Sequence, residues 1–256
     1  MRNNSTWALS ALSPIAWARE AWNLPLTLLA TLGAVAVAFI AQVAYLIAAV
    51  ATGSIDMHHP ALSPDQSLIA QIVIYVPLGA YLLLVIPALA RTSLRELGFH
   101  APSGRDLGVA VTGAVVMTIS VNVAGSALGA LTHRHDTETA VALMEQMKTP
   151  VERIAFFTVA CVLAPMLEEL AFRIFVFNAM TRYVPVAIAA LASGVLFGLV
   201  HSTSLAQIVT VSIPLAIGGI VLAYVYATTR CYWANVTTHA LFNGVAVVAL
   251  FVFHAK

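Results

Sequence analysis

The stretch Ala164-Pro-Met-Leu-Glu-Glu-Leu-Ala-Phe-Arg173 places two adjacent carboxylates and one guanidinium inside an otherwise apolar part of the chain. No charged residue occurs from Ile154 to Leu167. Each ionised group at the middle of a bilayer costs about 2.5 to 3.5 kcal/mol on insertion scales. We therefore interpret Glu168, Glu169 and Arg173 as a functional site that faces a cavity or partner helices; the alternative is a structural ion pair that locks helices together.

Helical spacing separates the roles of these three charges. Glu169 and Arg173 are four residues apart and share a helix face, whereas Glu168 shares a face with Phe172. The simplest arrangement lets Arg173 neutralise Glu169 and leaves Glu168 unpaired and able to handle protons. Pro165 removes one intrahelical hydrogen bond and tends to bend the helix near the acids, which would make room for water or a peptide.

The composition is that of a polytopic membrane protein. The chain has 256 residues, of which 61% are hydrophobic and 9% are charged, and its mean hydropathy is +0.92. Soluble domains contain near 25% charged residues, so we expect the lipid bilayer to be a partner. The net charge of +1 and the lack of a dense basic cluster indicate no nucleic-acid partner. Two cysteines, Cys161 and Cys231, offer no disulfide framework.

Hydropathy predicts an all-α, polytopic transmembrane helical bundle of about seven spans, with six to eight compatible. Residues 1–24 mix tryptophans with charged residues and are typical of an interfacial segment. Residues 25–256 form a single transmembrane domain, whose motif-bearing core is 151–253. The predicted spans are approximately 25–51, 67–90, 107–131, 151–180, 186–201, 205–228 and 232–253. We expect a kink in the sixth span, which contains Pro214.

Lys and Arg in the short loops indicate the orientation. The first loop, Thr52 to Gln66, contains neither residue type, whereas the N-terminal segment and the second loop contain Arg2, Arg19, Arg91, Arg95 and Arg105. Arg182 and Arg230 agree with this pattern, and Arg134 and Lys148 fall on the other side. We therefore predict a multi-pass membrane protein with a cytoplasmic N-terminus.

His201 can approach Glu168 if the fourth and fifth spans form a hairpin around Val184 and Pro185. Both residues are then about sixteen residues from the turn, roughly 24 Å at 1.5 Å per residue. Phe197 lies four residues before His201 on the same face. This position favours a role for His201 in the site over that of an ordinary interfacial histidine.

His239 and Asn243 form a second polar pair on one helix face. Such residues also join helices by hydrogen bonds without further function. His239 is only about eight residues into its span, so a shared depth with His201 requires the sixth span to be kinked or the loop before it to be recessed. With the acidic pair and His201 on neighbouring spans, we interpret both residues as part of one site.

Together these pieces resemble the CAAX prenyl protease and bacteriocin-processing (CPBP) family of intramembrane endopeptidases, also called the abortive-infection family. The resemblance covers Pro165 to Gly244 and implies an all-helical bundle that hydrolyses peptide bonds within or near the membrane. It rests on Glu-Glu-x-x-x-Arg (Glu168, Glu169, Arg173), Phe-x-x-x-His (Phe197, His201) and His-x-x-x-Asn (His239, Asn243), in this order on successive spans.

The resemblance implies a role for each motif residue. Glu168, together with His201, would activate the attacking water as a general base. His239 and Asn243 would stabilise the oxyanion of the tetrahedral intermediate. Glu169 and Arg173 would shape and neutralise the site. The candidate catalytic residues are thus Glu168, Glu169, His201, His239 and Asn243, and the site-shaping residues are Arg173 and Phe197.

The family is often labelled metalloprotease, and Glu168, His201 and His239 are chemically adequate zinc ligands. A metal-independent glutamate mechanism is equally consistent with these residues. We favour no obligatory, tightly bound metal. The motifs of rival hydrolases, His-Glu-x-x-His and Gly-x-Ser-x-Gly, do not occur in the sequence.

Two functions of other classes remain. A proton-coupled transporter would use buried Glu and His as a relay and predicts internal repeats, which the sequence does not contain. A non-catalytic scaffold or immunity protein would have a degenerate site, whereas every motif position is filled. The short single-domain chain resembles a bacterial member, so we expect a bacterial cytoplasmic membrane and peptide or membrane-protein substrates.

Overall fold

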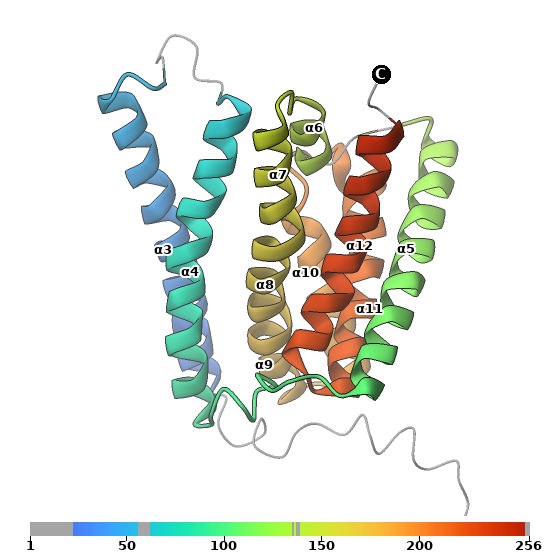
Figure 1. Cartoon of the computed structure of the whole chain (residues 1–256). Coiled ribbons are helices and arrows are strands. Elements are labelled where there is room, and N and C mark those ends of the chain that lie inside the picture. The colour runs from blue at the N-terminus through green and yellow to red at the C-terminus, as the bar shows by residue number, and fades with distance from the viewer. Residues whose placement is uncertain (1–22, 56–61, 135, 137–138, 254–256) are drawn as a thin grey trace, which may run out of the picture.

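The computed structural model describes residues 23–55, 62–134, 136 and 139–253, and every regular element in this part of the chain is a helix. Figure 1 shows the helices standing side by side as a bundle, with the α3–α4 hairpin at one edge. The long elements are α3 (Leu24–Ala51), α4 (Pro64–Ala90), α5 (Gly104–Thr132), α11 (Ile213–Thr229) and α12 (Tyr232–Phe253). The shorter ones include α6 (Thr139–Glu145) and α10 (Val186–Val200).

The predicted polytopic helical bundle is confirmed. In the described residues, six helical stretches are long and apolar enough to cross a membrane, and the shorter apolar helix Val186–Val200 corresponds to the remaining predicted span, 186–201. The interfacial segment predicted for residues 1–24 lies almost wholly outside the described residues, and the division into domains stays a prediction.

One continuous helical rod, Pro150–Thr181, carries the acidic motif. It consists of α7 (Pro150–Thr158), the π-helix η2 (Val159–Leu163), α8 (Ala164–Glu169), the π-helix η3 (Leu170–Phe177) and α9 (Asn178–Thr181). The rod begins with a capping box in which Thr149 and Glu152 satisfy each other's backbone N–H groups. The two π-helical turns flank the Glu168–Glu169 pair. π-Helical turns are rare in proteins, and those that occur often lie at functional sites.

The first π-helical turn accommodates Pro165. The N–H of Ala164 bonds to the carbonyl of Val159, five residues earlier, and Pro165 follows as the second residue of α8. Pro214 has the same position in α11, directly after the π-helix η4 (Ile208–Ser212). The expected proline bends are thus local changes of hydrogen-bond register in helices that continue.

Helix α10 is short because it ends inside the bundle. Its 15 residues extend about 22 Å, and His201 is its C-cap. It packs closely on η4 and α11 through glycines: a Cβ atom at Gly194 would lie 2.7 Å from the carbonyl oxygen of Ala216 in α11, and one at Gly198 would clash with that of Ser212 in η4. Only glycine permits this approach of the two backbones.

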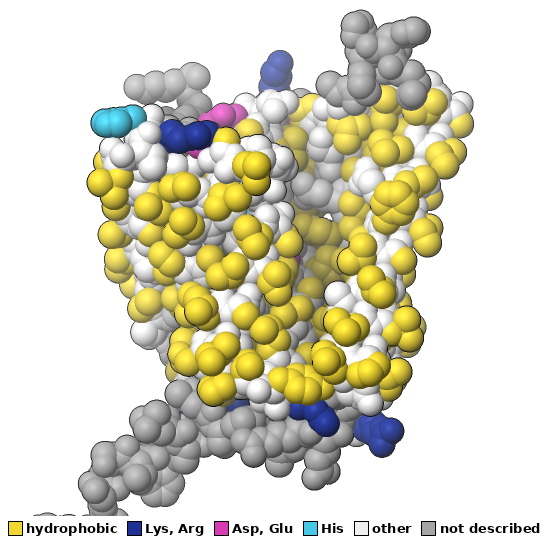
Figure 2. Space-filling model, turned by 180° about the vertical axis from the view of Figure 1, so that it is seen from behind, with side chains coloured by type: hydrophobic (Ala, Val, Ile, Leu, Met, Phe, Trp, Pro, Cys, Tyr) yellow, Lys and Arg dark blue, Asp and Glu magenta, His cyan; other side chains and the backbone are white. Residues whose placement is uncertain are grey.

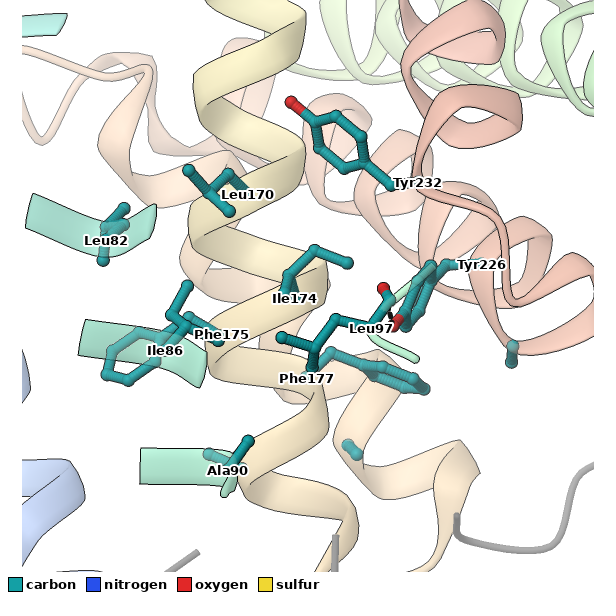
Figure 3. Close-up of a cluster of buried hydrophobic side chains, with 14 of the residues drawn as sticks. Leu82, Ile86, Ala90, Leu97, Leu170, Ile174, Phe175, Phe177, Tyr226 and Tyr232 are labelled. Atoms are coloured by element: carbon teal, nitrogen blue, oxygen red, sulfur yellow. Dashed lines mark hydrogen bonds between the residues drawn. The ribbon is translucent and has the colours of Figure 1, made fainter. Parts of the chain in front are cut away.

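The main apolar core lies between the rod, α4 and the C-terminal helices. Figure 3 shows Phe175 of the rod beside Ile86 of α4, and Ile174 and Phe177 on the side of the rod that faces Tyr226 of α11. These five side chains are less than 5% exposed. This packing holds the rod in a fixed position between its neighbours.

The outer surface is apolar along the sides of the bundle. Figure 2 shows hydrophobic side chains covering the face that is turned toward the viewer, with charged groups near the two ends. The same view shows a hollow between the α3–α4 hairpin and the rest of the bundle. An apolar belt of this kind is what a bilayer requires.

The α10–α11 contact gives a first prediction. Gly198→Ala places a methyl group against the Ser212 backbone and is expected to destabilise the protein by about 3 kcal/mol. Equilibrium unfolding in detergent measures this change. Gly108→Ala on α5, where no neighbouring atom lies within 4 Å of the new Cβ, is the matched control. Equal unfolding midpoints for the two variants would contradict the described packing.

Candidate active site

The site is built around a buried ion pair in the rod. Arg173 Nε lies 3.1 Å from Glu169 Oε2, one helical turn apart, and neither side chain has any exposed surface. Arg173 Nη2 donates to the carbonyl of Gly219 on α11. The guanidinium also lies 4.7 Å from the centre of the Phe197 ring, a cation–π contact. The predicted pairing of Arg173 with Glu169 is therefore present.

Glu169 also receives two hydrogen bonds from α12. His239 Nδ1 lies 2.8 Å from Oε1, and the side-chain amide of Asn235 donates to Oε2. An ionised carboxylate only accepts, so Nδ1 of His239 must carry a proton. Glu169 thereby fixes the tautomer and the orientation of the His239 ring.

Glu168 points to the opposite side and meets both histidines. Its Oε2 lies 3.7 Å from His201 Nε2 and 3.8 Å from His239 Nε2. The hairpin between α9 and α10 brings Glu168 and His201 to the same depth, as the sequence predicts. Because α10 ends inside the bundle, the loop before the sixth span is recessed, and His239 reaches the same depth as Glu168 and His201. This is one of the two arrangements that the sequence requires for a shared depth.

Three acceptor groups converge at this point. The Nδ1 atom of His201 lies 2.6 Å from the carbonyl oxygen of Phe197, so this nitrogen carries the proton. In neutral imidazoles, both Nε2 atoms then present lone pairs to the Glu168 carboxylate. Glu168 Oε2 is buried and has no hydrogen-bond partner among the residues that the structure describes. A proton or a water molecule between these atoms is needed to satisfy them.

Phe197 forms the apolar wall of the site. Its ring centre lies 4.6 Å from that of His201 and 5.6 Å from that of His239. Phe172 packs edge-on against it, with the ring centres 5.4 Å apart. The ring is 1% exposed, so it places an apolar, low-dielectric group against the histidines and Arg173, which strengthens their electrostatic interactions.

Asn243 occupies a different position from the two histidines. Its amide donates to the carbonyl of Ala160 in η2, at 2.7 Å. In the π-helical register this carbonyl would pair with the N–H of residue 165, which is a proline and has none. One N–H of the Asn243 side-chain amide thus satisfies the Ala160 carbonyl, which has no N–H partner at Pro165. The amide has two N–H bonds, so the second remains available.

The arrangement does not form a recognisable metal site. Within the described ranges, no group of three or more His, Cys, Asp or Glu side chains is placed to hold a metal ion. The nearest atoms of the candidate ligands are Glu168 Oε2 and the two imidazole nitrogens, at 3.7 Å for His201 Nε2 and 3.8 Å for His239 Nε2. We derive no step of the reaction through a metal.

Sequence reasoning missed Asn235, which is fully buried and contacts Glu169. The available signal is its spacing, because Asn235, His239 and Asn243 are successive residues four apart on one face of α12. It also missed two other anchors of this helix: Thr238 donates to the carbonyl of Ala110 on α5, and Tyr232 donates to that of Met166 in the rod.

The comparison with family models supports the same region. Residues 150–245 match the family described as type II CAAX prenyl endopeptidase Rce1-like. This range includes the rod, both histidines and Asn243, and it confirms the resemblance that the motifs indicate. At the level of the family it implies a peptidase of the CAAX type in a membrane. Searches of the curated proteins and of the solved structures found no match.

The buried ion pair gives a second prediction. Arg173→Met leaves the Glu169 carboxylate buried without its cation and is expected to cost about 3 to 5 kcal/mol of stability. The double variant Glu169→Gln/Arg173→Met removes both charges and is expected to recover part of this loss. Unfolding in detergent measures both variants. Arg134→Met, which breaks an exposed ion pair with Asp136, serves as the control and should change little. A similar small change for Arg173→Met would contradict the central place of this pair.

Proposed function

We propose that this chain, with its Rce1-like region at residues 150–245, is an intramembrane endopeptidase in which Glu168 activates a water molecule. The observation that carries the proposal is the unsatisfied Oε2 atom of Glu168, which faces the Nε2 atoms of His201 and His239. The other carboxylate, Glu169, is fully occupied by Arg173, His239 and Asn235. Glu168 is therefore the carboxylate that supports general-base chemistry best.

The spacing of these atoms suits a bound water. Glu168 Oε2 is 3.7 to 3.8 Å from each histidine Nε2 atom. If a water oxygen lies about 2.8 Å from Oε2 and from one Nε2 atom, the angle between these two contacts at the water is about 85°. Water can donate to Glu168 and to one of the histidine nitrogens at the same time. The side chains of Glu168 and His201 are 16% and 17% exposed, so the site is enclosed but reachable.

In the proposed reaction, Glu168, assisted by His201, accepts one proton of the water. At the same time the water oxygen attacks the carbonyl carbon of the substrate peptide bond. The tetrahedral intermediate carries the negative charge on the former carbonyl oxygen. Its collapse breaks the C–N bond, and the proton held by Glu168 moves to the leaving nitrogen. The products are one carboxylate and one amine.

The oxyanion is assigned to His239 and Asn243. Because Nδ1 of His239 donates to Glu169, its Nε2 can donate to the oxyanion only after the ring has taken up one proton from solvent and become an imidazolium, whose positive charge the Glu169 carboxylate supports. Asn243 would contribute the amide N–H that Ala160 does not use. In this proposal Arg173 balances the charge of Glu169, whose Oε1 atom stays available to His239.

The surroundings of the site support a peptide or membrane-protein substrate. The side of the bundle is hollowed between the α3–α4 hairpin and the other helices (Figure 2), and an extended segment of a membrane-associated protein or a peptide could lie there. We propose peptide or membrane-protein substrates. Placement in a bacterial cytoplasmic membrane, with the N-terminus in the cytoplasm, stays a prediction from the sequence.

The third prediction concerns Glu168→Gln. Glutamine keeps the shape of the side chain but cannot accept the proton, so cleavage is expected to fall by about 100- to 10,000-fold. The measurement is cleavage of a mixed library of peptides and membrane proteins by the purified, detergent-solubilised chain, with products identified by mass spectrometry. Glu145→Gln in α6 is the matched control and should retain wild-type cleavage.

The possible results separate the proposed function from its rivals. Identical product lists for the wild type and Glu168→Gln would show that Glu168 is not the base. No cleavage by the wild type, together with proton-coupled uptake in liposomes, would favour the transporter. Loss of wild-type cleavage on treatment with a strong chelator, with recovery on adding zinc, would contradict the metal-independent form of the mechanism.

A further inference from the structure

Asn235 on α12 is the polar residue of the site that the motifs do not include. Its side chain is 0% exposed, and its amide nitrogen donates to Glu169 Oε2. Its own Oδ1 has no hydrogen-bond partner within the described part of the chain. A buried amide with one unsatisfied oxygen costs free energy. An apolar residue of the same volume would avoid this cost, so the amide nitrogen is the group that explains the presence of asparagine here.

The contact with Glu169 determines what Asn235 can do. Oε1 of this carboxylate accepts from His239, while Oε2 forms the ion pair with Arg173 and accepts from Asn235. The two Oε2 contacts therefore fix the rotation of the carboxylate, and this rotation sets the direction of the bond from Oε1 to the imidazole. Asn235 and His239 are one turn apart on the same helix, so a single carboxylate binds both.

The charge balance favours a neutral donor at this position. Glu169 is already paired with Arg173, and a second cation would leave an excess buried charge. An aspartate would place another carboxylate against Glu169. The charged and titratable groups around this point are Glu168, Glu169 and Arg173 of the rod, His201 after α10, and Tyr232 and His239 of α12.

We infer that Asn235 is a positioning residue of the proposed peptidase: it orients Glu169 so that His239 presents its Nε2 atom to the reacting oxygen. The inference rests on the proposed function for its effect on catalysis. Its structural part, the dependence of the His239 hydrogen bond on Asn235, does not. The two parts have separate tests.

The structural test observes the His239 Nδ1 proton. Proton and nitrogen NMR of the full chain with ¹⁵N-labelled histidine, in detergent micelles, is expected to show a downfield Nδ1–H signal that disappears in His239→Gln. Asn235→Leu should shift or broaden this signal, because the carboxylate is free to rotate. Asn178→Leu is the matched control, since Asn178 is equally buried but bonds to Ile174 and Tyr226 away from the site. An unchanged signal in Asn235→Leu overturns the inference.

The catalytic test is the fourth prediction and uses Asn235→Asp. A protonated aspartic acid can donate to Glu169 as the amide does, whereas an aspartate repels it. The cleavage rate of a peptide identified with the wild type, taken relative to the wild type at each pH, is expected to fall about tenfold between pH 6 and pH 9 as the proton is lost. The same ratio for Asn178→Asp should stay constant.

Asn235→Leu separates positioning from substrate binding. Its kcat is expected to fall about 30-fold at every pH while KM changes by less than about twofold, because the residue does not touch the substrate. A ratio for Asn235→Asp that is constant with pH, or a loss confined to KM, overturns the positioning role. A wild type that cleaves nothing, with an NMR signal that depends on Asn235, would refute the proposed function and support the Asn235–Glu169–His239 arrangement.

Discussion

The structure depends on one buried ion pair, Glu169 with Arg173. Two unpaired charges could not be placed at this depth, because removing each from water costs several kcal/mol. The pair is supported by polar and aromatic partners from three other helices: Gly219 on α11, Phe197 on α10, and Asn235 with His239 on α12. The same contacts therefore join the C-terminal helices to the rod and organise the site.

This pairing divides the work between two adjacent carboxylates. Glu169 is bound to groups of the protein, and in the proposed mechanism it acts on the reaction through His239. Glu168 is one position earlier and about 100° around the helix. Its Oε2 atom has no hydrogen-bond partner in the described part of the chain and faces two imidazole nitrogens. Adjacent residues on a helix point to different environments, so the sequence Glu-Glu can supply one structural and one reactive acid.

Much of this arrangement could be predicted from the sequence. Hydropathy located the spans, since a bilayer imposes long apolar helices, and the four-residue spacing of Glu169 and Arg173 predicted their contact. Counting from the α9–α10 turn predicted that Glu168 meets His201. The π-helical turns around Pro165 and Pro214 were not predicted, because a one-residue change in hydrogen-bond register leaves no distinct composition. Asn235 was missed because a single asparagine in a span most often forms a hydrogen bond between helices without further function. Only the tertiary structure identifies Glu169 as its partner.

The most direct test of the account is an experimental structure of the chain in a lipid environment, at a resolution that reveals ordered water. The account predicts a water within hydrogen-bond distance of Glu168 Oε2 and of Nε2 of His201 or His239, with Glu169 still bound to Arg173, Asn235 and His239. A structure in which Glu168 pairs with Arg173 and Glu169 faces the water would contradict it, because the two carboxylates would then have exchanged roles.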